Sequence, residues 1–164
     1  MALKNSKDIE KMLRGIMETV VEDVSNKIYK TLLDLIQETI YDEPSGKWYK
    51  RHGYNGGFIG AFKLEDLKKT SLKMAKEIVY DYASMSLSGN NGYSHGDKSS
   101  YIDRRKDLYW ILNDYIWNRE ESEFGGAKGV RENVIGYLDV FDMTISNKIW
   151  MWVREAIKKT GAKI

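Results

Sequence analysis

Few side chains in this sequence are of the types and spacings that enzymes use for chemistry. The two histidines, His52 and His95, are far apart and form no His-Glu-x-x-His arrangement, and the chain contains no cysteine. The usual ligands of a zinc site and the thiolate nucleophile are therefore missing. The adjacent acidic pairs 42–43 and 120–121 are typical of solvated surfaces, because neighbouring side chains point in different directions. We expect no catalytic residue, no metal site, no cofactor and no enzymatic activity.

The turn-rich polar segment 88–99 ends in Gly96-Asp97-Lys98-Ser99, which invites comparison with a phosphate-binding loop. That motif requires Gly-Lys-Ser/Thr in direct succession, and here Asp97 separates the glycine from the lysine. Its carboxylate would also repel a phosphate. Phosphate binding at this segment is therefore not expected.

Composition limits the class of protein. The 164 residues are 42% hydrophobic and 30% charged, with a net charge of +2, which is typical of one globular domain spanning residues 1–164. The nearly balanced charge gives no overall indication of nucleic acid or membrane as partner. No apolar run approaches the roughly 18 residues that span a bilayer, and no signal-peptide core follows the first residues. We expect the chain to fold in a cytoplasm.

The least ordinary stretch runs from Trp48 to Phe62 and passes from basic and aromatic residues through a glycine pair into a short apolar run. It lies mostly within segment 41–57, which we predict to be an ordered loop because the segment is too rich in glycine for a helix and too aromatic for a plain linker. Tryptophan, tyrosine and arginine dominate the energetics of protein interfaces. The predicted interface residues are Trp48, Tyr49, Arg51, Tyr54, Phe58 and Trp150.

Hydrophobic periodicity predicts an α+β fold. Apolar residues three and four apart indicate a long amphipathic helix over about 6–40, capped by Asn5 or Ser6. Core packing is its favoured role, and a partner-binding helix is the alternative. Alternation from residue 58 to residue 87 indicates a small antiparallel sheet of short strands, with a helix over 67–82 as the competing interpretation. The candidate core residues at its start are Phe58, Ala61 or Phe62, and Leu64.

Two further helices complete the predicted fold. Ser100 and Asp103 resemble a capping box at the start of a helix over about 100–117, and a polar loop follows at 118–136. The last helix covers about 139–160, with Gly161 as its stop. Trp150 and Trp152 cannot both face the same side of that helix, so at least one should meet solvent or a neighbouring subunit.

The order of these elements, together with Tyr49-x-Arg51-x-Gly53-x-x-Gly56-Gly57-Phe58-Ile59 and the ending Ala-Ile-Lys-Lys-Thr-Gly-Ala, resembles the neck and tail-completion family of long-tailed bacteriophages. In that family a similar Tyr-x-Arg segment opens the sheet. This sequence departs from the pattern at His52 and Phe58, and its loop 118–136 lacks the Arg-Pro that often precedes the last helix.

The resemblance implies a structural virion protein of the head-tail junction or tail end, found in the virion and in the host cytoplasm during assembly. Its partners would be copies of itself, arranged in a ring, and other phage head-tail or tail proteins. Residues 46–57 would form one contact surface of the ring, since a ring uses two different surfaces of each subunit. The alternative is a nucleic-acid-binding or host-directed regulatory protein that uses the basic aromatic loop 47–54.

Overall fold

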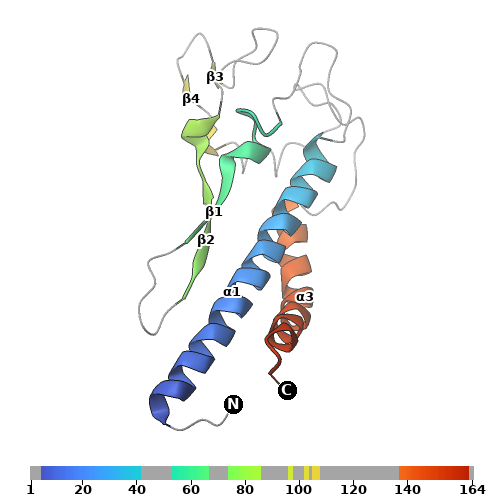
Figure 1. Ribbon diagram of the computed structural model, residues 1–164. Coiled ribbons are helices and arrows are strands. Elements are labelled where there is room, and N and C mark those ends of the chain that lie inside the picture. Colours follow the sequence, from blue (N-terminus) through green and yellow to red (C-terminus); the bar gives the residue numbers. More distant parts are fainter. Residues whose placement is uncertain are drawn as a thin grey trace. The chain divides into compact units, whose positions relative to one another are not determined.

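The computed structural model describes residues 5–41, 53–66, 74–85, 96–97, 102–103, 105–107 and 137–162. The described chain is mostly helical and also contains two small two-stranded antiparallel sheets (Figure 1). It divides into two compact units. Unit 1 draws on residues 1–30, 64–78 and 144–164, and unit 2 on residues 31–63 and 79–143. Each unit therefore combines segments that are distant in sequence.

The predicted long N-terminal helix is present as α1, Ser6–Ile36, and continues into a π-helical turn, Gln37–Tyr41. Its first turn is capped by Asn5, whose Oδ1 accepts a hydrogen bond of 3.0 Å from the Asp8 backbone N–H. In the last turn the Thr39 hydroxyl donates to the Leu35 carbonyl at 2.6 Å. Capping at one end and this side-chain hydrogen bond at the other satisfy backbone groups that a helix terminus leaves open.

The sheet begins later than its sequence pattern predicts. Residues 59–61 form a 3₁₀ turn, because Ala61 N–H bonds back to the Phe58 carbonyl, and strand β1 covers Phe62–Asp66. Strand β2, Lys76–Tyr80, pairs with β1 and is followed by a 3₁₀ turn at Tyr82–Ser84. The competing helix over 67–82 is wrong for residues 74–80, which are extended.

The helix predicted over about 100–117 is not found where the structure describes that segment. Ile102–Asp103 instead forms β4, which pairs antiparallel with β3, Gly96–Asp97, so that Asp103 lies opposite Gly96. Residues 105–107 then make a 3₁₀ turn. Asp103 therefore belongs to a β-ladder and does not stand at the start of a helix, and residues 108–117 lie outside the described residues.

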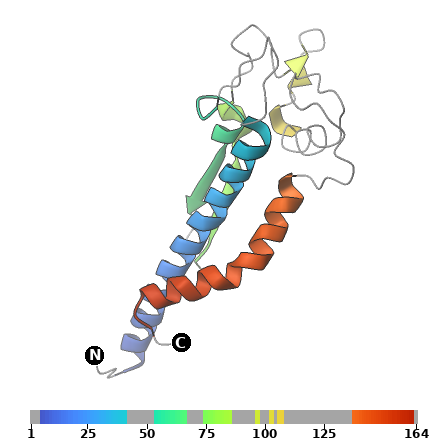
Figure 2. The ribbon, with the colours of Figure 1, turned by 90° about the vertical axis from the view of Figure 1, so that its right-hand side faces the viewer.

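The C-terminal helix is present as α3, Tyr137–Lys159, and the described chain thus holds two α-helices where three were predicted. Gly161 follows with a φ of 77°, a left-handed conformation that favours glycine and ends the helix as predicted. Within unit 1, Figures 1 and 2 both show the later part of α3 beside α1, while the amino-terminal end of α1 extends past it.

Each unit has its own interior. In unit 1, Val24 of α1 meets Trp152 and Ala156 of α3, and aliphatic side chains of both helices surround them. Ala156 is fully buried, and its small side chain lets the helix backbones approach. In unit 2, the rings of Phe58, Phe62, Tyr80 and Tyr137 pack together, with centroid separations of 5.0 to 6.3 Å.

Candidate functional site

The predicted interface residues differ in whether the structure describes them and in how exposed they are. Trp48, Tyr49 and Arg51 lie outside the described residues, as do the basic residues of the alternative nucleic-acid loop. Tyr54 is 64% exposed and Trp150 is 73% exposed, so both are available to a neighbour. Trp152 is 8% exposed, which confirms that the two tryptophans of the last helix face different sides.

Phe58 differs from its predicted interface role because its ring belongs to the interior of unit 2. It is 4% exposed and makes edge-to-face contacts with Phe62, Tyr80 and Tyr137. Edge-to-face packing places the positive ring edge against a negative ring face, which adds to the gain from burial. The prediction of Phe58 and of Ala61 or Phe62 as core residues is confirmed, since all three are buried, whereas Leu64 is only half-buried.

The glycines of this stretch shape a tight turn in unit 2. Gly53 and Gly56 have φ values of 60° and 77°, which residues with a side chain rarely adopt. A Cβ at Gly60 would lie 2.2 Å from the Tyr54 carbonyl oxygen. The Tyr41 hydroxyl accepts a hydrogen bond of 3.2 Å from Ile59 N–H and fixes the end of the turn. Backbone geometry thus accounts for these glycines without any ligand.

Hydrogen bonds also tie the aromatic interior of unit 2 to the 3₁₀ turn at 105–107. The Tyr80 hydroxyl donates to the Arg105 carbonyl at 2.6 Å, and Arg105 Nη1 donates to the Met85 carbonyl at 2.6 Å. The Tyr80 hydroxyl and the Arg105 guanidinium thereby satisfy two backbone carbonyls near a buried region. Arg105 is therefore committed to structure and is not positioned to bind a substrate anion.

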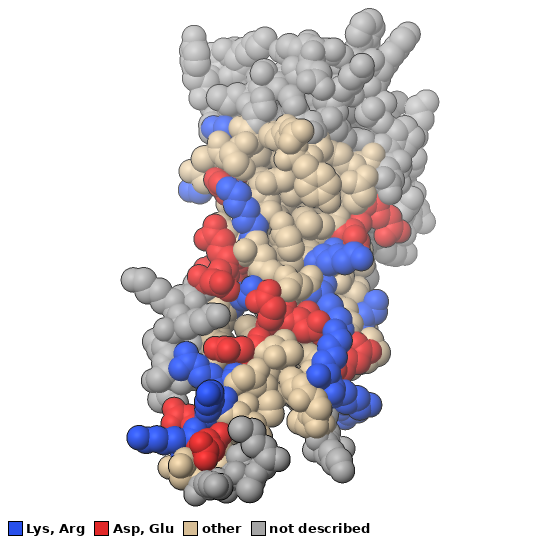
Figure 3. Space-filling view, in the orientation of Figure 1, with Lys and Arg blue, Asp and Glu red and all other residues tan. Residues whose placement is uncertain are grey.

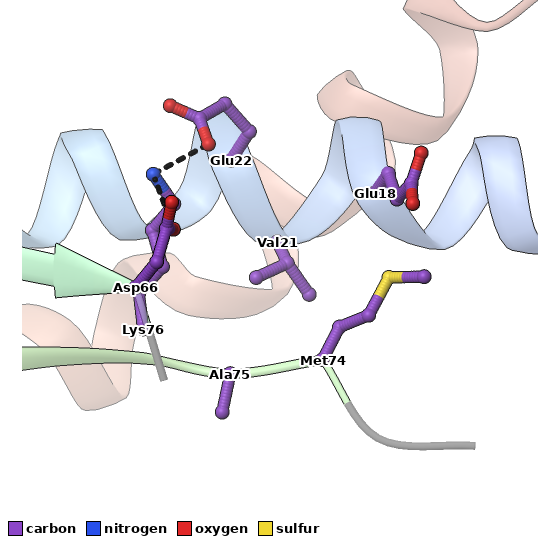
Figure 4. A pocket seen from close by; sticks show the side chains of 7 residues that line it. All are labelled: Glu18, Val21, Glu22, Asp66, Met74, Ala75 and Lys76. Atoms are coloured by element: carbon purple, nitrogen blue, oxygen red, sulfur yellow. Dashed lines mark ion pairs between the residues drawn. The ribbon is translucent and has the colours of Figure 1, made fainter. Parts of the chain in front are cut away.

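A small pocket in unit 1 lies between α1 and the β1–β2 pair (Figure 4). Its lining consists of Glu18, Val21, Glu22, Asp66, Met74, Ala75 and Lys76. The Lys76 ammonium lies 2.5 Å from a Glu22 oxygen and 3.3 Å from an Asp66 oxygen. The hydrogen bond with Glu22 raises the pKa of Lys76 above its ordinary value. Lys76 therefore stays protonated and joins strand to helix, so it is no candidate nucleophile.

An ion-pair network joins α1 to α3 on the surface of unit 1. Lys159 Nζ lies 2.8 Å from Asp23 Oδ1, and Lys27 Nζ lies 2.7 Å from Glu155 Oε2 and 3.5 Å from Asp23 Oδ2. The hydrogen bond from Lys159 lowers the pKa of Asp23, and the hydrogen bond to Glu155 raises the pKa of Lys27. These ion pairs bridge the two helices beside their apolar contact.

Neither a metal site nor a membrane span is found in the described part of the chain. No three His, Cys, Asp or Glu side chains gather there in a way that could hold an ion, and both histidines lie outside it. None of the described helices is long and apolar enough to cross a bilayer.

Exposed apolar side chains are the feature of unit 1 that best suits a function. Four of them form a row along the first turns of α1 and are 42% to 50% exposed: Ile9, Met12, Leu13 and Met17. Their spacing of three to four residues keeps them on one side of the helix. On α3, Trp150 is joined by Met151, which is 50% exposed. We call the first group the α1 row.

The α1 row was assigned mainly to core packing in the sequence, and only the later part of the helix bears this out. Val24, Leu32 and Ile36 are buried, whereas the α1 row is not. The difference in helix length explains this exposure. At 1.5 Å per residue, the 31 residues of α1 extend about 46 Å and the 23 residues of α3 about 34 Å. The shorter helix cannot cover the longer one.

Comparison with known protein families, curated proteins and solved structures found no match for this chain.

Proposed function

We propose that this protein is a non-enzymatic structural component that assembles with copies of itself into an oligomeric ring. The observation that carries the proposal is the exposed apolar surface of unit 1, formed by the α1 row together with Trp150 and Met151. Clustered exposed apolar side chains, such as the α1 row, commonly mark contact surfaces. Aromatic and methionine side chains are also enriched at such surfaces.

The place of assembly is the head-tail junction or tail end of a long-tailed phage particle. The support for this part of the proposal is the resemblance of segment 49–59 and of the C-terminal ending to the neck and tail-completion family. Partners besides the chain itself would then be other head-tail or tail proteins. The exposed side chain of Tyr54, within that segment, suits a contact with one of them.

The native mass of the purified chain tests self-assembly. We expect light scattering after gel filtration to give a multiple of 19.0 kDa that rises with concentration and rises further when phage tail or head-completion proteins are added. The double variant Leu13→Glu/Met17→Glu should weaken association by roughly tenfold or more, because burial of one such side chain contributes about 1.5–3 kcal/mol.

The control is Asn26→Glu, which also adds negative charge, one unit instead of two, at an exposed position on another side of α1 and should assemble like the wild type. Circular dichroism should show that all three proteins keep their helix content. A wild type that remains a monomer at every concentration, with or without the phage proteins, would reject the proposal.

A further inference from the structure

The outward face of α3 in unit 1 is basic and apolar. Core residues Ile145, Ile149 and Trp152 mark the opposite, inward face of this helix. Helical spacing places four exposed residues on the outward side, with the exposed Lys148 at its edge, and we call these five the basic face: Lys148, Trp150, Met151, Arg154 and Lys158. Figure 3 shows Lys and Arg side chains, with acidic side chains among them, on the right-hand side, where Figure 1 places both α3 and the later part of α1.

The charges of the basic face have no counterpart in the described part of their own chain. The acidic residue of the same stretch, Glu155, is paired with Lys27, and the further cation Lys159 is paired with Asp23. Lys148, Arg154 and Lys158 make no ion pair within the described residues. Three cations around an exposed tryptophan and methionine therefore present a surface suited to an acidic partner.

The β1–β2 pair of unit 1 carries an acidic face that is complementary. Lys76 points toward α1, where it pairs with Glu22, so alternation along the strands turns Glu65 and Glu77 away from α1. Both are exposed and make no ion pair in the described chain. The exposed side chain of Ala75 shares the face of Glu77. We call these three residues the acidic face.

Strand pairing places the two carboxylates of the acidic face opposite each other. The Asp81 N–H donates to the Ala61 carbonyl at 2.8 Å, and counting along an antiparallel ladder from this bond brings Glu65 to Glu77. Like charges directly opposite in a sheet repel and destabilise the pair. The nearest cation on the same strand, Lys63, is bound to Asp81. A cation placed beside the two carboxylates would relieve this repulsion.

We propose that the basic face of α3 docks on the acidic face of the β1–β2 pair of a second copy of this chain. Arg154, Lys148 and Lys158 reach Glu65 and Glu77 of the neighbour, and Trp150 with Met151 covers the flat surface around Ala75. Each copy uses one face as donor and the other as acceptor, which is the head-to-tail contact that a ring requires. This inference rests on the proposed self-assembly and names the two surfaces that make it.

Charge reversal on each face provides the test. Glu65→Lys/Glu77→Lys makes both faces basic, and Arg154→Glu/Lys158→Glu makes both acidic. Alone, each variant should lose association by roughly a hundredfold or more, because like charges across an interface cost several kcal/mol. Mixed in equal amounts, the two variants should co-assemble, since each reversed face then meets its complement. Native mass by light scattering reads out both results.

Matched controls reverse exposed charges elsewhere, with Glu38→Lys for the acidic face and Lys106→Glu for the basic face, and both should assemble normally. Glu65→Gln/Glu77→Gln removes the charges without adding new ones and should weaken association while keeping the native circular dichroism. This variant retains a readout if Glu65→Lys/Glu77→Lys fails to fold.

The outcomes separate this inference from the proposed function. A monomeric wild type would reject both. A wild type that assembles, with reversal variants that assemble equally well or do not rescue each other, would reject the two faces and keep self-assembly. If Arg154→Glu/Lys158→Glu left the mass unchanged but abolished binding to duplex DNA at physiological salt, the basic face would belong to a nucleic acid and the inference would be wrong.

Discussion

Unit 2 closes around aromatic rings, whereas unit 1 closes around aliphatic side chains flanked by ion pairs. Phe58, Phe62 and Tyr137 are at most 7% exposed in unit 2. In unit 1 the helices meet through Val24, Trp152 and Ala156, with Asp23 and Lys159 paired beside them. The aromatic interior gains from area and ring geometry, and the helix pair gains its alignment from charge.

The surfaces of the units differ as well. Of the nine large apolar side chains that are exposed in the described residues, six belong to unit 1. Two of the three in unit 2 are Tyr54 and Tyr82, whose hydroxyls can meet water. Within the described residues, unit 1 therefore presents more apolar surface that a neighbour could cover.

The largest loss of stability is expected from Phe58→Ala in the aromatic interior of unit 2. Removing a buried ring that contacts three others should lower the free energy of unfolding by about 3–5 kcal/mol. Urea titration followed by circular dichroism measures the loss. The control, Tyr82→Ala, truncates a ring of the same unit that is 38% exposed, and it should cost far less. Equal losses in both variants would mean that unit 2 does not depend on its aromatic interior.

Two glycine variants should move stability in opposite directions. Gly60→Ala in unit 2 should destabilise by about 1–3 kcal/mol, because the new Cβ meets the Tyr54 carbonyl oxygen at 2.2 Å. Gly15→Ala in α1 has nothing within 4 Å of the new Cβ and should stabilise by about 0.5–1 kcal/mol through helix propensity. Thermal unfolding compares the two melting temperatures. A drop in both would show that the surface of α1 around Gly15 is packed against a neighbour.

Regular elements with a strong period were predictable from the sequence. The spacing of apolar residues gave the extents of α1 and α3 to within a few residues, because a helix buries one face whatever its partner is. Asn5 as cap and Gly161 as stop follow from local backbone chemistry, which needs no knowledge of tertiary contacts.

Features set by tertiary contacts were not predictable. The stretch 58–61 alternates like a strand, yet the burial of Phe58 among distant rings is accompanied by a 3₁₀ turn there. Asp103 fits a capping box in sequence, but pairing with Gly96 places it in a ladder. The acidic and basic faces need the pairing of β1 with β2 and of α1 with α3, and neither register is visible in one strand or helix alone.

The smallest effect concerns the ion pairs of unit 1 and their dependence on pH. Because the hydrogen bond from Lys159 lowers the pKa of Asp23 below 3.8, the ionised carboxylate stabilises the fold above that pH, and its contribution is lost as pH falls through the lowered pKa. The pKa of Lys27 is raised, so the charged ammonium stabilises the fold until the pH exceeds 10.5. At neutral pH both Asp23 and Lys27 are charged and both contributions are present. Asp23→Asn should cost about 0.2–1 kcal/mol at neutral pH, as partly exposed pairs do, and almost nothing well below pH 3.8. Urea unfolding of the wild type and the variant at the two pH values measures whether their free energies of unfolding converge at low pH. A gap that stays constant would show that Asp23 acts through its shape rather than its charge, and the helices of unit 1 would then be aligned by packing as unit 2 is.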